Sequence, residues 1–270
     1  MLPDDPVFNH PTEYHTPPGR AGWLPRLFPC LCLYPLIWKC ICQGSYAAMR
    51  GRYDDEAWAL NSFQVLQSLE YVGCRIHAEG LEHITEVQGP CVIVGNHMSA
   101  LETLVLPGFV EPRKHVTFVV KRSLTTSRVF GYIMRSRDPV VVDRRNPRED
   151  LAAMLTGSAE RLARGISMIV FPQATRSPNF DREHFNSIGV KIAGRNNVPL
   201  IPLALKTDAW SCGSKGVLKD YGKVRPDLPV HLRFGKAFRV EGNGKEEQEQ
   251  LCRFIEDALA EWRGESVPQQ

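Results

Sequence analysis

The chain has 270 residues, enough for one large domain with its own hydrophobic core but few for two full-sized domains. Its 43% hydrophobic and 23% charged residues are close to the averages of soluble globular proteins, which excludes a disordered chain, a collagen-like repeat and a coiled coil. Lys and Arg number 33 against 30 Asp and Glu, so the net charge of +3 does not indicate a nucleic-acid-binding protein.

The first part of the chain suits a segment that associates with a membrane surface without crossing it. Residues 1–20 are expected to be a disordered tail. The longest apolar run, Phe28 to Trp38, has eleven residues and contains two prolines, whereas a spanning helix needs about 20. Asp4 and Asp5 stand where a signal peptide has basic residues, so export is not expected.

Aromatic residues of this N-terminal region, with basic residues at its edges, suit a position at the lipid interface. They are Trp23, Phe28, Tyr34 and Trp38, with Arg26 and Lys39. An arm packed on the domain is an equally good interpretation. From Asp54 to Val72 apolar residues recur with helical spacing, which predicts an amphipathic helix. This helix could belong to the core or form the second half of a membrane-docking hairpin, and its periodicity does not distinguish the two.

The eight cysteines do not follow the spacing of a metal site. Four of them form two C-x-C pairs in the apolar stretch, whereas structural zinc sites usually place about two to four residues between ligands. The paired residues are Cys30, Cys32, Cys40 and Cys42. We therefore expect no metal, and reduced thiols as in a cytoplasmic protein.

Beyond Gly73 short apolar runs alternate with helical patterns, which predicts an α/β domain over residues 73–263. The seven predicted strands are Arg75–Glu79, Cys91–Gly95, Val116–Val120, Pro139–Asp143, Ser167–Phe171, Leu200–Leu205 and Val230–Phe234. One helix is predicted from its cap at Asn146 through Arg164, and another from Lys245 to Trp262. Residues 264–270 are expected to be a disordered tail.

A polar cluster from Asn96 to Glu102 directly follows the predicted strand Cys91–Gly95. In α/β sheets the carboxyl ends of strands are where ligands bind. His97 and Glu102 are five residues apart and cannot share a helical face, so His97 must lie in the turn for the two side chains to meet. Glu102 can then accept the proton of one ring nitrogen and leave the other nitrogen as a general base, although a surface ion pair gives the same spacing.

A second polar cluster, Phe171 to Ser177, follows another buried strand. Thr175, Arg176 and Ser177 offer a guanidinium and two hydroxyls, which suit a phosphate as well as an ordinary capped loop. Between the two clusters, residues 112–148 carry ten Lys and Arg against two Asp, which favours an anionic partner such as a phosphate-bearing substrate or a lipid surface. Motifs of α/β-hydrolases, P-loops and dinucleotide-binding folds are missing.

Taken in order, these clusters resemble the sequence blocks of the glycerolipid acyltransferase family. Asn96-His97-x4-Glu102 resembles the N-H-x4-D block, and Phe171 to Ser177 is similar to F-P-E-G-T-R-S. Three further segments also resemble family blocks. Lys121 with Leu124 and Phe130-Gly131 resembles the K-x-x-L and F-G block, Val141 to Arg144 the hydrophobic-D-R block, and Val198 to Pro202 the closing V-P-hydrophobic-hydrophobic-P block. The resemblance spans about Arg75 to Leu205, nearly half of the chain.

The resemblance implies a single α/β acyltransferase domain with a mostly parallel or mixed sheet of about seven strands flanked by helices. It also implies an N-terminal helical element over residues 21–72, in the form of two helices that dock on the cytoplasmic face of a phospholipid membrane. His97 would deprotonate a lyso-lipid acceptor, lysophosphatidic acid, for attack on acyl-CoA or on an acyl-carrier-protein thioester, and Glu102 would orient His97. No cofactor and no nucleic acid are implied.

The same resemblance implies that Lys121, Arg144 and Arg176 hold the acceptor phosphate. The remaining residues expected at the substrate are Asn96, Ser99, Gln173, Thr175 and Ser177. The chain departs from the family blocks at three positions, with Glu102 for Asp, Gln173 for Glu and Ala174 for Gly. These departures leave open another lyso-lipid or an acyl-amino-acid lipid as acceptor. The altered block at Gln173 also leaves open a non-catalytic module that binds anionic lipid, which the intact His97 and Glu102 argue against.

Overall fold

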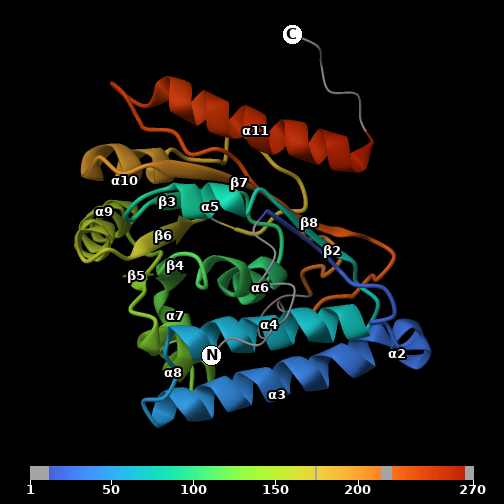
Figure 1. The fold of residues 1–270 in the computed structure, drawn as a ribbon. Helices are drawn as coiled ribbons and strands as arrows, with labels where there is room; N and C mark the ends of the chain where they lie inside the picture. Colours follow the sequence, from blue (N-terminus) through green and yellow to red (C-terminus); the bar gives the residue numbers. More distant parts are fainter. Residues whose placement is uncertain (1–11, 174, 214–220, 265–270) are drawn as a thin grey trace.

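A computed structural model describes residues 12–173, 175–213 and 221–264. Within these residues eight strands form one mixed sheet in the order β1-β2-β8-β7-β3-β6-β4-β5, with helices on both faces (Figure 1). The strands are β1 (Glu13–His15), β2 (Ile76–Glu79), β3 (Val92–Gly95), β4 (Val116–Lys121), β5 (Val140–Val142), β6 (Ser167–Val170), β7 (Leu200–Lys206) and β8 (Val230–Phe234). The α/β fold and all seven predicted strands are confirmed, each to within about two residues.

Five neighbouring strands of the sheet run in the same direction. β3 pairs in parallel with both β6 and β7, and β4 pairs in parallel with both β6 and β5. β8 is antiparallel to β7 and parallel to β2. The carboxyl ends of β7, β3, β6, β4 and β5 therefore lie along one edge of the sheet, which is where ligands bind in this class of fold.

The sheet separates two apolar layers because successive side chains of a buried strand point to opposite faces. In β3, Ile93 packs into the layer that contains α4 (Asp55–Tyr71) and α6 (Leu101–Val110). Val92 and Val94 pack into the opposite layer, with α9 (Pro147–Ala163), α10 (Ile188–Asn196) and α11 (Lys245–Arg263). The predicted helices at Asn146–Arg164 and Lys245–Trp262 are confirmed as α9 and α11. The short helices are α5 (Glu82–Glu86), α7 (Arg122–Thr125) and α8 (Phe130–Ser136).

The N-terminal tail, predicted to be disordered over residues 1–20, contains a strand, and the prediction is wrong there. β1 is antiparallel to β2, and Tyr14 between its two exposed neighbours is buried. The Tyr14 hydroxyl donates a 2.6 Å hydrogen bond to Glu70 Oε1 of α4. A three-residue strand is too short for its alternation to be recognised in the sequence. Residues 1–11 and 265–270 of the predicted tails lie outside the described residues.

From residue 12 onward, three helices precede the α/β domain: α2 (Trp23–Leu27), α3 (Pro29–Met49) and α4. α3 and α4 lie side by side beneath the sheet in Figure 1. α3 continues through Pro35, which lies on its exposed side, so the prolines do not interrupt this segment. Gly44 permits the close approach, because a Cβ there would lie 3.0 Å from Asn61 Oδ1 of α4. Within the described residues no helix combines the length and apolarity needed to cross a membrane.

The helix predicted over Asp54–Val72 is confirmed as α4. It contacts α6 beside Pro107 and holds that helix in place. Pro107 of α6 has no N–H, which weakens the regular hydrogen bonding of that helix. The Ser62 hydroxyl of α4 donates to Leu104 O at 2.6 Å and accepts from Gly108 N at 2.8 Å. This contact between helices fixes α6, whose first turn carries Glu102.

Candidate active site

The polar clusters singled out in the sequence follow the carboxyl ends of adjacent parallel strands. β3 leads into Asn96 and His97, β6 leads into the segment from Phe171, β4 ends at Lys121 and β5 leads to Arg144. Blocks separated by up to about 80 residues in sequence therefore meet at one sheet edge, as expected for a doubly wound sheet.

His97 and Glu102 form a hydrogen-bonded pair. His97 lies in the turn between β3 and α6, as the five-residue spacing requires, and Glu102 lies in the first turn of α6. His97 Nδ1 is 2.8 Å from Glu102 Oε1. Because a carboxylate only accepts hydrogen bonds, Nδ1 carries the proton and Nε2 is left as the basic nitrogen.

The Glu102 carboxylate is fully buried and surrounded by donors. Besides His97, its Oε1 accepts from the N–H of Met98 at 2.7 Å and of Ser99 at 3.0 Å. Its Oε2 accepts from the hydroxyls of Ser99 at 2.9 Å and Thr207 at 2.6 Å. Burial alone would raise the pKa of the Glu102 carboxyl, but the hydrogen bonds from His97, Thr207 and Ser99 outweigh burial and hold the pKa below its ordinary value.

The His97 ring and backbone are held by the segment after β6. The ring stacks on Phe171 with centroids 4.5 Å apart and planes 9° apart. Gln173 Oε1 accepts a 2.6 Å hydrogen bond from His97 N, and Ser177 N donates a 2.9 Å hydrogen bond to His97 O. The side chain is 13% exposed, and among the described residues Nε2 has no hydrogen-bond partner. A fixed histidine with one open, basic nitrogen can remove a proton from a bound hydroxyl.

Asn96 and Ser99, expected at the substrate, are turned into the protein. Asn96 Nδ2 donates to Leu205 O at 2.8 Å, and Asn96 Oδ1 accepts from Leu205 N at 2.9 Å, which joins the end of β3 to β7. Ser99 binds Glu102 and accepts from Leu101 N at 3.1 Å. Both side chains, like Gln173, therefore position the histidine turn. A sequence block shows which residues are near a site, whereas the direction of a side chain depends on the fold.

Lys121 and Arg144 lie together in a cationic cleft of about 430 Å³ at the same edge of the sheet as the pair. The other residues that line the cleft are Arg122, Ser123, Thr126, Asp143 and Arg145. Arg122 forms an ion pair with Asp143. Arg176, in the segment after β6, is half-buried, and Thr175 beside it is exposed. Neither residue is among the described residues that line the cleft. Ala174 lies outside the described residues. The excess of positive charge suits a phosphate.

Thr207, which directly follows β7, was not singled out from the sequence. Phe171, which directly follows β6, was named as the start of the second cluster but was given no role. The rule that ligands bind at the carboxyl ends of parallel strands, applied to the polar run after Leu205, is the signal that points to Thr207.

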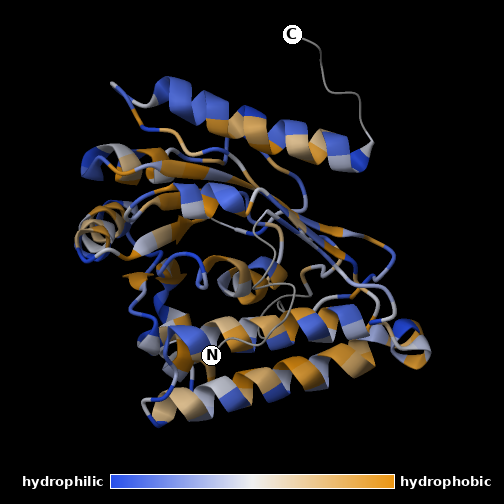
Figure 2. Ribbon diagram, in the orientation of Figure 1, coloured by the Kyte–Doolittle hydropathy of each residue, from blue (hydrophilic) through white to orange (hydrophobic). Residues whose placement is uncertain are grey.

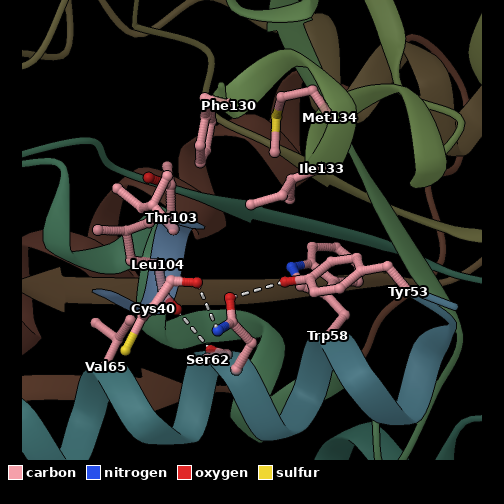
Figure 3. A pocket seen from close by; sticks show the side chains of 12 residues that line it. Cys40, Tyr53, Trp58, Ser62, Val65, Thr103, Leu104, Phe130, Ile133 and Met134 are labelled. Carbon is pink, nitrogen blue, oxygen red and sulfur yellow. Dashed lines mark hydrogen bonds between the residues drawn. The ribbon is translucent and has the colours of Figure 1, made fainter. Parts of the chain in front are cut away.

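A small crevice lies among the N-terminal helices, α6 and α8 (Figure 3). Asn61 donates to Cys40 O at 3.0 Å and accepts from the Tyr53 hydroxyl at 2.9 Å, so α3, α4 and the turn between them are tied together there. The crevice has a volume of about 30 Å³, which is about the size of one water molecule. It therefore has no room for a substrate in this conformation.

Asp55, Glu111 and His115 are the one group of metal-ligand side chains brought together within the described residues. Glu111 and His115 directly precede β4, at the opposite end of that strand from Lys121, and Asp55 of α4 lies 3.1 Å from His115 Nδ1. His115 Nδ1 is 2.6 Å from Glu111 Oε1, and Asp55 pairs with Arg137 at 2.6 Å. Burial raises the pKa of the Glu111 carboxyl to about 7. The group satisfies its own hydrogen bonds and joins α4, α6 and β4.

The family model described as Acyltransferase matches residues 75–206. The chain is 28% identical to the 1-acyl-sn-glycerol-3-phosphate acyltransferase of Pseudomonas aeruginosa, over 81% of this chain and 80% of that protein. It is 30% identical to the chloroplastic 1-acyl-sn-glycerol-3-phosphate acyltransferase BAT2 of Brassica napus, over 54% of this chain and 42% of that protein.

The crystal structure of the 1-acyl-sn-glycerophosphate (LPA) acyltransferase PlsC from Thermotoga maritima has the same fold. Its TM-score is 0.69 at 20% identity, over 91% of this chain and 99% of that chain. Fold and sequence matches together define an O-acyltransferase. The family model and these relatives agree with the resemblance to glycerolipid acyltransferases that the ordered blocks indicate.

Proposed function

We propose that this protein transfers a fatty acyl group from an acyl thioester to the free hydroxyl of lysophosphatidic acid. The donor is acyl-CoA or an acyl-carrier protein. The observation that carries the proposal is the buried, hydrogen-bonded Glu102 carboxylate behind a histidine whose Nε2 is open. The relatives named as acyltransferases of 1-acyl-sn-glycerol-3-phosphate support the choice of acceptor.

In the proposed reaction His97 Nε2 takes the proton of the acceptor hydroxyl as the oxygen attacks the thioester carbonyl. The imidazolium that forms is stabilised by Glu102, which keeps the Nδ1 proton in place. Collapse of the tetrahedral intermediate breaks the carbon–sulfur bond, and the proton held by Nε2 passes to the departing thiolate. The ester forms in one transfer, without a covalent acyl-enzyme.

The acceptor phosphate is proposed to bind Lys121 and Arg144 in the cationic cleft, with Arg176 contributing from the loop after β6. Lys121 and Arg144 line the same cleft and are exposed, which supports their part of the assignment. Each charge-assisted hydrogen bond to a phosphate contributes about 1.5–3 kcal/mol. Two or three such contacts are enough to favour a phosphate-bearing acceptor over a neutral one.

Gln173 in place of the family Glu was the one feature that favoured a non-catalytic lipid-binding module. In the structure its Oε1 accepts the His97 N–H. A glutamate oxygen would accept the same hydrogen bond, so the substitution preserves the position of His97. This contact supports a catalytic protein.

The acceptor is proposed to be reached from a phospholipid surface on which α2 and α3 dock, at the cytoplasmic face. Large apolar side chains there are exposed, and Figure 2 shows the apolar character of α3. They are Trp23, Leu24, Leu27, Phe28, Leu31 and Trp38. An exposed apolar face of this kind on a helix suits the boundary between headgroups and acyl chains.

The proposal is tested with purified protein and vesicles that contain one lyso-acceptor at a time. Radiolabelled acyl-CoA and acyl-carrier protein are offered in parallel, and lysophosphatidic acid is compared with phosphate-free lyso-lipids and an acyl-amino-acid lipid. We expect transfer to lysophosphatidic acid to be fastest with one of the two donors. Preference for another acceptor would overturn the assigned substrate, and no transfer to any acceptor would support the non-catalytic module.

A further inference from the structure

Among the residues that the structure describes, Thr207 is the one donor to Glu102 that comes from outside the turn carrying the pair. It directly follows β7 and is fully buried, and its hydroxyl lies 2.6 Å from Glu102 Oε2. The other donors belong to His97, Met98 and Ser99, which are local to Glu102 in sequence. Thr207 is 105 residues away, so β7 supplies this contact through the fold.

The hydroxyl protons can be placed by counting donors and acceptors. Ser99 Oγ accepts from Leu101 N and has one proton for two neighbours, Glu102 Oε2 at 2.9 Å and Thr207 Oγ1 at 3.0 Å. Thr207 Oγ1 lies closer to Glu102 Oε2 than to Ser99, so its proton points to the carboxylate. Thr207 thus donates directly to Glu102, whichever neighbour the Ser99 proton serves.

The two carboxylate oxygens have largely different partners. Oε1 accepts from His97 Nδ1 and Met98 N, whereas Oε2 accepts from the hydroxyls of Ser99 and Thr207. The Ser99 N–H lies within hydrogen-bond distance of both oxygens, at 3.0 and 3.1 Å. A donor fixed on Oε2 opposes rotation of the carboxylate about its terminal bond, which is a broad torsion without such contacts. The direction of Oε1 toward His97 therefore depends on what holds Oε2.

We propose that Thr207 is a positioning residue for the proposed acyl transfer: its hydroxyl keeps the Glu102 carboxylate ionised and turned with Oε1 toward His97. The inference rests on the proposed function. Glu102 stands where the family block has Asp, and its side chain, one methylene longer, reaches the strand end that carries Thr207. The chain thus combines a longer carboxylate with a donor on the neighbouring strand to hold it.

The other charges near Glu102 do not replace this contact. His97 is the ionisable group that acts on the Glu102 carboxyl, together with the hydroxyl of Thr207 and the N–H of Ser99. Lys206 and Asp208, on either side of Thr207, pair with each other at 2.9 Å. Loss of the Thr207 hydroxyl would leave Glu102 Oε2 with donors from Ser99 alone, its hydroxyl and its N–H at 3.1 Å.

The test compares Thr207→Val, which has nearly the same shape, with Thr207→Ser, which keeps the hydroxyl. The pH dependence of kcat/KM is measured with lysophosphatidic acid and the better donor. We expect Thr207→Val to lower kcat about 10- to 100-fold and to shift the acid limb of the profile to higher pH, because the hydroxyl no longer favours the ionised carboxylate. Thr207→Ser should restore both the rate and the profile.

Thr117→Val is the matched control. Thr117 is also a buried threonine at the sheet, but its hydroxyl donates at 2.6 Å to the neutral carbonyl of Arg137. This variant should leave the pH profile where it is. An unshifted profile in Thr207→Val, with the rate either unchanged or lowered equally at every pH, would overturn the positioning role.

A second measurement does not need activity. Nuclear magnetic resonance of the ¹⁵N-labelled histidine rings, with His97→Gln to identify the signal of His97, follows proton binding by the pair. We expect the titration of the pair to move to higher pH in Thr207→Val and to return in Thr207→Ser; an unmoved titration would overturn the inference. Absence of acyl transfer by the wild-type protein would count against the proposed function, whereas this titration tests Thr207 by itself.

Discussion

Replacing Glu102 with Gln removes one charge from the pair while nearly preserving its volume. The best arrangement of the new amide places its oxygen where Oε1 lies, because that oxygen accepts from His97 Nδ1 and from the N–H groups of Met98 and Ser99. The amide nitrogen then faces the hydroxyls of Ser99 and Thr207, whose oxygens can accept from it. His97 keeps its tautomer and direction in Glu102→Gln.

What the Glu102→Gln variant loses is the charge that stabilises the imidazolium. A hydrogen bond to a charged group contributes about 1.5–3 kcal/mol, more than a neutral one, and this pair is buried. We therefore expect kcat to fall by about 10²-fold, within the range for general-base catalysis. KM for the acceptor should change little, because Glu102 is fully buried and does not reach the cationic cleft.

Steady-state kinetics on vesicles that contain lysophosphatidic acid measure both constants. Thermal unfolding and circular dichroism of the variant show that the fold is retained. An unchanged kcat, or a raised KM with kcat unchanged, would refute the assignment of Glu102 as the residue that stabilises the imidazolium.

Three further predictions concern the acceptor, the membrane and stability. Arg176→Ala should raise KM for lysophosphatidic acid about tenfold and leave phosphate-free lyso-lipids unaffected; an equal effect on both acceptors would make Arg176 structural. Leu31 of α3 is 74% exposed, and Leu31→Ser should reduce co-sedimentation with anionic vesicles; full retention on vesicles would contradict docking through α3. Burial, together with the nearby His77, lowers the pKa of His231 to about 4. The unfolded chain therefore binds a proton at His231 more tightly than the folded protein, so the free energy of unfolding should rise with pH between about 4 and 6.5. Urea unfolding across this range should show a smaller slope in His231→Gln, and an equal slope would contradict the role of His231.

The sequence predicted the sheet well because its central strands are buried on both faces. Such strands appear as continuous apolar runs, and β3, β6 and β7 are buried throughout. β1 was missed because a single buried residue, Tyr14, carries its contact with the core. The continuity of α3 through Pro35 was also missed, because a proline inside a helix removes a backbone hydrogen bond and usually kinks or breaks the helix.

The pair at the centre of the site was predictable from its five-residue spacing. His97 and Glu102 can meet only if His97 lies in the turn before the helix that carries Glu102. The contacts that hold the pair were not predictable. Asn96 with Leu205 and Glu102 with Thr207 join residues more than 100 positions apart, and only the register of β3 with β7 brings them together. The same is true of Gln173, whose contact with the His97 backbone depends on the pairing of β3 with β6.

The central claim is that His97 acts as the general base for acyl transfer, and the turnover of His97→Ala tests it most directly. Radiolabelled acyl transfer to lysophosphatidic acid is measured for the wild-type protein and for the variant, with circular dichroism to confirm that both are folded. We predict transfer by the wild-type protein and none by His97→Ala above the uncatalysed rate, with acceptor binding retained in the variant. Turnover like that of the wild-type protein in folded His97→Ala would contradict the claim.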